Sequence, residues 1–215
     1  MREILEGLWH WKVIWPDVWS LECYFLRTEH GGVIVDPIES TDIGAIDAAD
    51  DIQAVVVTSG WHERSARLFG KRYGVPVYVP EQDLCMIEDL DKYETYGDGD
   101  VLPGNLRAIG CPGLTRGEQA LLSDVHGGVL FTADCLGCTA KWAPDGMTLG
   151  GHPNGHPHPS DTLSHLLDQS FTHLCPGHGD PLIGCGRSEF ESLLASGRST
   201  STAPPRVTYA PLPSI

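Results

Sequence analysis

The sequence predicts an α/β protein in which sheets lie inside and helices lie outside. Strand patterns fill the first forty residues, a β-α-β pattern follows, and strand patterns return before a final helix-strand-helix segment. Sheets and helices that follow one another in this order are typical of sheets covered by helices. The chain has 215 residues, enough for one large domain with a buried core.

The N-terminal part begins with an expected hairpin. Residues 20–28 (SLECYFLRT) and 32–36 (GVIVD) flank the turn-like segment EHGG. Pro37 ends the second strand because proline cannot donate a hydrogen bond to a sheet. The short apolar run AVVVT at 54–58 is typical of a strand buried on both faces, as in a parallel sheet.

A β-α-β unit is expected over residues 52–80. Residues 63–73 follow the strand with apolar side chains at i, i+3 and i+7, which favours a helix. Gly74 suits the position after the end of this helix. The segment VPVYVP at 75–80 is the next strand.

The second half contains strand patterns at 106–111, 118–123 and 127–134, of which the last two form a hairpin candidate. Residues 139–160, rich in Gly, Pro and His, are expected to form an extended loop. A helix is then expected at 161–170, followed by a short strand in FTHLCPGHGDPL.

The last helix is expected over residues 188–197, with Ser188 as N-cap and a glutamate three residues later, the pattern of a capping box. We therefore expect one domain over residues 1–198. The tail at 199–215 is polar and rich in proline, so it is expected to be flexible.

The charge excludes some partners. The 29 acidic and 14 basic residues give a formal net charge of −15, which repels nucleic acid and anionic membranes. The sequence shows no signal peptide and no apolar run near the about 20 residues that a membrane span needs. The seven cysteines are an odd number, and we expect them to be reduced thiols in a cytoplasmic protein.

Four segments resemble, in order, the motifs of the metallo-β-lactamase superfamily. VVVTSGWHERSA (55–66) resembles its strand followed by T-H-x-H-x-D-H, and AIGCPGLTRGEQALL (108–122) resembles its P-G-H-T-x-G-S segment. LFTADCLG (130–137) resembles L-F-x-G-D, and LCPGHGDPL (174–182) resembles the final P-G-H-G. The hairpin that ends in VIVDP also resembles the early strand of that fold. The resemblance covers most of residues 3–195 and implies a four-layer αββα sandwich with its site at the sheet edges.

Most metal ligands of that family do not carry over. The family's ligand positions fall on these residues, of which only the last two are unchanged: Ser59, Trp61, Glu63, Arg64, Leu114, Asp134 and His178. A neutral hydroxyl is a poor zinc ligand, indole and leucine side chains cannot coordinate, and a guanidinium is a permanent cation. The resemblance therefore implies a hydrolase-like protein whose dinuclear zinc site is largely lost.

The leading hypothesis is a cleft that binds a small molecule or performs limited hydrolysis without a cofactor. Its candidate residues are His62, Glu63, Arg64, Asp134 and His178. Arg64 is expected to pair with Asp134, because a buried unpaired carboxylate is costly.

Two alternatives remain open. The first is a hydrolase with one divalent metal, zinc by preference, on His62, Asp134 and His178. It requires His62 to turn inward, although this residue is one position out of register with the family's second histidine; otherwise His62 begins the helix and points to solvent. The second is a non-catalytic interaction domain, which could be a homo-oligomer that associates through its N-terminal tryptophans.

Two further groups of metal-binding residue types have simpler interpretations. His152, His156 and His158 could hold a metal, but a solvent-exposed loop is the favoured interpretation. Cys135 and Cys138 form a CxxC pair that could bind zinc with a third thiol or act in redox chemistry; buried, inert cysteines are the favoured interpretation.

Overall fold

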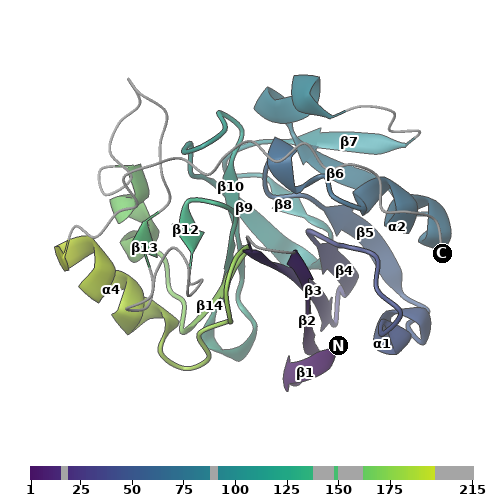
Figure 1. Cartoon of the computed structure of the whole chain (residues 1–215), viewed down its shortest axis with the longest axis horizontal. Helices are drawn as coiled ribbons and strands as arrows, with labels where there is room; N and C mark the ends of the chain where they lie inside the picture. The colour runs from purple at the N-terminus through teal and green to yellow at the C-terminus, as the bar shows by residue number, and fades with distance from the viewer. Residues whose placement is uncertain (16–18, 88–91, 138–147, 150–161, 197–215) are drawn as a thin grey trace.

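The structure is a computed structural model that describes residues 1–15, 19–87, 92–137, 148–149 and 162–196. Two sheets lie face to face and helices cover their outer sides (Figure 1). The expected tail at 199–215 and most of the expected loop at 139–160 lie outside the described residues.

The first sheet has seven described strands in the order β1-β2-β3-β4-β5-β6-β7. Their bounds are β1 Arg2–Leu5, β2 Leu8–Trp15, β3 Trp19–Thr28, β4 Gly31–Val35, β5 Ile52–Val56, β6 Val77–Pro80 and β7 Tyr93–Tyr96. The expected hairpin is the antiparallel pair β3–β4. Strand β5 is parallel to both of its neighbours, β4 and β6, as its continuous apolar run predicts.

The second sheet has five described strands in the order β14-β11-β10-β9-β8. Their bounds are β8 Val101–Leu102, β9 Leu106–Gly110, β10 Gln119–Ser123, β11 Val129–Thr132 and β14 His173–Pro176. The hairpin β10–β11 is antiparallel, whereas β11 and β14 are parallel. A separate small ribbon joins β12 Leu136–Gly137 to β13 Thr148–Leu149.

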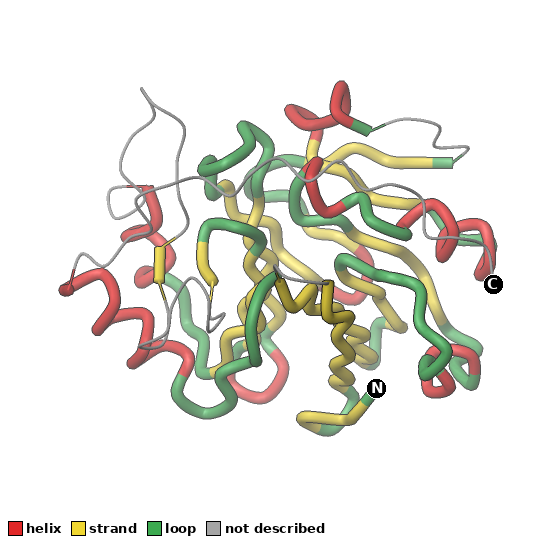
Figure 2. Tube along the Cα trace, viewed as in Figure 1, coloured by secondary structure: helices red, strands yellow, loops and turns green. Residues whose placement is uncertain are grey.

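The helices lie on both outer faces, as the red segments of Figure 2 show. The described α-helices are α1 Gly44–Asp47, α2 Ala66–Tyr73 and α4 Gly186–Ser196. The 3₁₀ helices are η1 Gly60–His62, η2 Glu81–Met86, η3 Pro103–Asn105, η4 Val125–Gly127 and η5 Ser164–Asp168. None of the described helices is long and apolar enough to cross a membrane.

Three apolar clusters hold the layers together. One lies between the sheets and joins residues such as Val35 and Val56 to Phe131 and Cys175. A second packs the first sheet against α1 and α2, and a third packs the second sheet against η5 and α4. Burial of these side chains on both faces of each sheet confirms the four-layer αββα sandwich.

Two α-helix boundaries differ from expectation, and the helix expected at 161–170 is mostly the 3₁₀ helix η5, Ser164–Asp168. Helix α2 begins at Ala66, because η1 occupies residues 60–62 and Arg64 has a left-handed backbone with φ 43°. Helix α4 begins at Gly186, two residues before the expected cap. There the Ser188 hydroxyl donates to the Cys185 carbonyl at 2.9 Å and caps nothing.

Candidate metal centre

The site lies where the two sheets bring the ends of parallel strands together. Asp36 follows β4 and Thr58 follows β5, which are neighbours in the first sheet. Asp134 follows β11 and His178 follows β14, which are neighbours in the second sheet. Because parallel strands end at the same edge, each pair of polar residues reaches one edge of its sheet.

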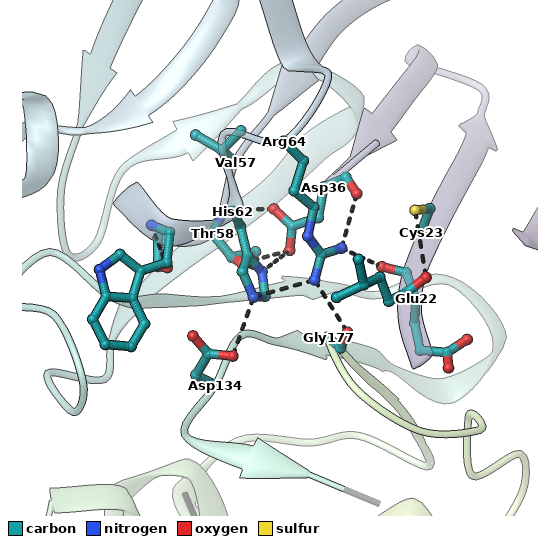
Figure 3. Close-up of polar contacts among 12 residues, drawn as sticks. Glu22, Cys23, Asp36, Val57, Thr58, His62, Arg64, Asp134 and Gly177 are labelled. Atoms are coloured by element: carbon teal, nitrogen blue, oxygen red, sulfur yellow. Dashed lines mark hydrogen bonds and ion pairs between the residues drawn. The ribbon is translucent and has the colours of Figure 1, made fainter. Parts of the chain in front are cut away.

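His62 points into the protein, where its exposed fraction is 1%. Its Nδ1 lies 2.8 Å from Asp36 Oδ2 and its Nε2 lies 3.2 Å from Asp134 Oδ1 (Figure 3). The 3₁₀ helix η1 sets this orientation: the Ser59 hydroxyl accepts from the Trp61 N–H at 3.2 Å, and the chain then turns His62 back toward β4. The histidine is therefore a member of the site despite its shift in register.

His178 completes a group of three donors. Its Nε2 lies 2.7 Å from Asp134 Oδ1, and its Nδ1 lies 2.9 Å from the Ser20 carbonyl oxygen. One donor atom from each of His62, Asp134 and His178 lies within 4.8 Å of the other two. Among the described residues, this is the one group of three metal-binding side chains at such distances.

Asp36 holds the His62 ring through Nδ1, the nitrogen that does not face Asp134. The Thr58 N–H donates to Asp36 Oδ1 at 2.8 Å, and the Thr58 hydroxyl donates to Oδ2 at 2.6 Å. Asp36 itself has φ 49°, a left-handed conformation that a non-glycine residue adopts at a cost of roughly 1–3 kcal/mol. Surrounding contacts must hold it there, so this carboxylate is held in place before any ligand arrives.

Arg64 joins segments from both sheets. Its Nη1 donates to the carbonyls of Glu22 at 2.7 Å and Asp36 at 3.1 Å. Its Nη2 donates to the Gly177 carbonyl at 3.2 Å and also lies 3.2 Å from His62 Nε2 (Figure 3).

The expected pair between Arg64 and Asp134 is wrong. Among the described residues, the ion-pair partners of Asp134 within 4.0 Å are His62 and His178. The left-handed backbone of Arg64 directs its guanidinium toward main-chain carbonyls, and two histidines already reach the carboxylate.

Glu63 is the candidate residue that the structure places apart from these contacts. Its side chain is half-buried, and burial raises its pKa more than the charge of Arg67, in the first turn of α2, lowers it. Within the described part of the chain, no hydrogen bond or ion pair joins the Glu63 side chain to Asp134 or to either histidine.

The charges at the site depend on one another. Burial and the charge of Arg64 lower the pKa of His62, but Asp36 and Asp134 outweigh them and raise it to about 9. Burial raises the pKa of both carboxyls, yet His62 and the other contacts hold the pKa of Asp36 below, and that of Asp134 well below, the ordinary value. Without a metal, His62 is thus an imidazolium between two carboxylates.

Ser59 and Leu114, which stand where the resembled family has metal ligands, have structural roles. The Ser59 hydroxyl begins η1, and the N–H of Leu114, a buried residue, donates to Glu118 Oε2 at 3.1 Å. A leucine side chain has no donor atom, and a neutral serine hydroxyl is a poor zinc ligand.

The sequence reasoning missed two buried carboxyls that support the site. Asp83 accepts hydrogen bonds from the Gly60 N–H, the Thr115 hydroxyl and the Gly117 N–H, at 2.8, 2.5 and 2.8 Å. Glu118 accepts from the Leu114 and Cys135 N–H groups, and burial with the nearby charge of Asp134 raises its pKa to about 8.

Asp36 was missed as well, although a signal existed. Asp36 lies at the end of β4, and Thr58 lies at the end of the neighbouring parallel strand β5. Both residues are therefore at the same edge of the sheet. The contacts of Asp83 and Glu118 have no such signal, since they depend on how loops far apart in the sequence pack.

The remaining candidates fall partly outside the described residues, namely Cys138 and the histidines at 152, 156 and 158. The described N-terminal tryptophan Trp11 is buried, donates its Nε1–H to the Ile38 carbonyl and stacks on Phe69. Trp9 stacks on Phe25. These two rings therefore pack within the domain.

The donor set fits a single metal ion. Two imidazoles and one carboxylate converge, and each imidazole uses Nδ1 to contact an outer oxygen, of Asp36 or of the Ser20 carbonyl. Metal-binding histidines usually make such an outer contact, because it fixes the tautomer that leaves the other nitrogen free for the ion.

Comparison with known proteins shows the fold. No protein-family model matches the sequence, and no curated protein does. Solved structures are similar over most of the chain. A metallo-β-lactamase family protein from Thermus thermophilus, TTHA1429, is 18% identical with a TM-score of 0.65, covering 90% of this chain and 80% of that one.

Two more structures agree with this result. The DIM-1 metallo-β-lactamase is 15% identical with a TM-score of 0.67, covering 90% of this chain and 95% of its own. TTHA1623, solved in a di-iron-bound form, is 20% identical with a TM-score of 0.60, covering 80% and 94%. At these identities the similarity shows a shared fold and does not assign an activity, which must be argued from the residues of the site.

Proposed function

We propose that this chain, which has the metallo-β-lactamase fold, is a hydrolase of small molecules that holds one divalent metal ion on His62, Asp134 and His178. The observation that carries the proposal is the convergence of two Nε2 atoms and one carboxylate oxygen within 4.8 Å of one another. Nitrogen and carboxylate donors at this ratio suit zinc and several other first-row metals.

A bound ion of this kind supplies a Lewis acid that polarises a substrate oxygen and lowers the pKa of water beside it. The protein's own groups prepare the donors. Asp36 and the Ser20 carbonyl accept the Nδ1–H protons of His62 and His178, so Nε2 of each ring is the nitrogen that faces Asp134 and would bind the ion. Asp134 supplies the negative charge that offsets a cation in a buried place.

In this proposal Arg64 is not a metal ligand, although its Nη2 lies 3.2 Å from His62 Nε2. Its guanidinium joins the carbonyls of Glu22, Asp36 and Gly177, and so holds the segment before His178 against the strand ends of the first sheet. We therefore assign it a positioning role.

A second candidate function has its own supporting observation. Arg64 Nη2 lies 3.2 Å from His62 Nε2, so a permanent cation stands beside the atom that a metal would need. The raised pKa of His62, about 9, also favours a proton at this nitrogen. In this candidate the site stays metal-free and the protein binds a small molecule there without hydrolysing it.

One experiment separates the two candidates. Chelated, tag-free protein is titrated with Zn²⁺, Mn²⁺ or Co²⁺ while hydrolysis of chromogenic thioester, lactone, lactam and phosphodiester reporters is followed. The proposal predicts a rate that saturates at one metal equivalent and falls at least about 100-fold in His62→Ala. The matched control, His30→Ala at an exposed histidine, keeps the rate.

Two results would count against the proposal. Protein that stays metal-free at saturating metal would favour the binding candidate. Protein that binds one ion but hydrolyses none of the reporters above the buffer rate would support the metal site and reject the hydrolase activity.

A further inference from the structure

The loop that carries His178 fills a free edge of strand β3. This strand pairs with β4 only as far as Tyr24, so residues 20–23 extend beyond the end of that neighbour. Backbone groups on a free strand edge need other partners. Here the Glu22 N–H donates to the Gly177 carbonyl at 3.0 Å. The edge of a strand in the first sheet is thus completed by the last loop of the second sheet.

Further contacts hold the same segment along β3. The Tyr24 hydroxyl donates to the carbonyl of Pro176, the residue before the loop, at 2.8 Å. Ser20 holds the next two positions: its carbonyl oxygen lies 2.9 Å from His178 Nδ1, and its hydroxyl accepts from the Gly179 N–H at 3.2 Å. The loop therefore follows β3 along the whole free edge, and the position of this strand sets the position of the histidine.

A buried ion pair anchors the middle of this edge. His10, on strand β2, contacts the Glu22 carboxylate through Nε2, and the exposed fractions of the two residues are 3% and 0%. The His10 ring also packs against the Tyr24 ring, with centroids 5.3 Å apart. Beside this pair, Lys12 Nζ lies 2.8 Å from the carboxylate of Asp180, the residue that ends the loop.

This buried pair is a poor device for stability alone. Its second carboxylate oxygen, Glu22 Oε1, is buried and has no hydrogen-bond partner among the described residues. Taking two charges out of water is costly, and one contact compensates the carboxylate only in part. Apolar side chains of similar volume often replace such pairs with no loss of stability. What the pair does supply is a directional contact that fixes one side chain of β3 to β2.

We propose that His10 and Glu22 are positioning residues of the metal centre. Their contact fixes β3 at the residue whose main chain binds both Gly177 and Arg64, and so orients His178 (Figure 3). For the bound ion this inference rests on the proposed function. The placement of the loop does not depend on a metal and can be measured in metal-free protein.

The test separates positioning from stability. In the variant His10→Leu/Glu22→Met, apolar side chains of similar volume replace the pair, so the free energy of unfolding in urea should stay equal or rise. Affinity for Zn²⁺ should nevertheless fall at least about tenfold, because the loop that holds His178 loses its anchor. In metal-free protein, hydrogen exchange of the amides at positions 22 and 179, which donate across this contact, should become at least about tenfold faster.

Two further variants complete the comparison. His10→Gln keeps an N–H donor for the Glu22 carboxylate, so Zn²⁺ affinity should return to within about threefold of the original value. Arg27→Met is the matched control, because it removes exposed ion pairs with Asp50 and Asp51 at the other end of β3. This control should leave both the affinity and the exchange rates unchanged.

Two results would overturn the proposal. The first is a double apolar variant whose affinity and exchange rates both match those of the original protein. The second is a loss of stability that accompanies the loss of affinity and does not recover in His10→Gln, which would make the pair purely structural. If the original protein binds no Zn²⁺, the proposed function fails, and the exchange rates alone decide this inference: faster exchange in the double variant supports it, and unchanged exchange rejects it.

Discussion

At the scale of single residues, two contacts with distant parts of the chain orient His62. Its Nδ1 contacts Asp36, which lies 26 positions earlier in the chain, and its Nε2 contacts Asp134, which lies 72 positions later. The sequence motif predicted Asp134 and His178 as retained residues. It could not decide whether His62 faces inward, because that depends on these two long-range contacts.

The pKa of His62 leads to a prediction on metal affinity. In metal-free protein this pKa is about 9, so Nε2 must lose a proton before it can coordinate an ion. Since binding releases that proton, the apparent Zn²⁺ affinity should rise about tenfold per pH unit between roughly pH 7 and 9 and level off above that range. Titration against a chromophoric chelator at several pH values measures this slope.

Asp36→Asn is the matched variant for that titration. The amide keeps the shape but removes the charge that raises the pKa of His62, so the affinity should level off at lower pH. Loss of the outer carboxylate should lower the affinity on the high-pH plateau, where His62 carries no competing proton, by about 10- to 100-fold. A flat pH profile in the original protein would show that His62 carries no competing proton.

At the scale of elements, apolar patterns predicted the strands well and the turns poorly. The run AVVVT predicted the parallel strand β5, and Gly74, with φ 69°, ends α2 as expected. The segment between them was harder, because residues 60–62 form η1 and Arg64 is left-handed. The Arg64 conformation is stabilised by carbonyls of three distant segments, which no local pattern encodes.

Asp83 gives a prediction at this scale. It accepts hydrogen bonds from the loop that holds His62 and from the loop that holds Thr115, and it is buried. Asp83→Ala leaves these donors without a partner, so the free energy of unfolding should fall by about 2–4 kcal/mol in urea denaturation.

Asp98→Ala is its control. This exposed aspartate accepts one hydrogen bond, from the Gly110 N–H at 2.9 Å, and its loss should cost about 1 kcal/mol or less. Equal losses in both variants would mean that Asp83 does not join the two loops.

At the scale of the whole molecule, the site exists only because the two sheets meet at one edge. The first sheet supplies Asp36 and positions His62, and the second sheet supplies Asp134 and His178. The sequence predicted the two sheets and their order along the chain. It did not predict which side chains face one another across the interface, since those contacts arise from packing of segments that no motif links.

Gly177 tests this interface without removing a metal donor. It lies in the second sheet's last loop, and a Cβ added there would lie 2.5 Å from His62 Cε1. Because Cβ atoms do not approach other atoms so closely, Gly177→Ala must displace His62. Zinc affinity should fall at least about tenfold. Gly97→Ala, where a Cβ meets nothing within 4 Å, should leave it unchanged. Equal affinities in the two variants would contradict the packing described.

The metal content of tag-free protein, measured by elemental analysis, tests the single-metal site most simply. We expect about one divalent ion per chain, and its loss both in His62→Ala and in the double variant Asp134→Ala/His178→Ala. The variant His152→Ala/His156→Ala/His158→Ala, in the histidine-rich segment, should keep the ion. Folded protein that stays free of metal after exposure to excess Zn²⁺ would mean that His62, Asp134 and His178 do not form a metal site.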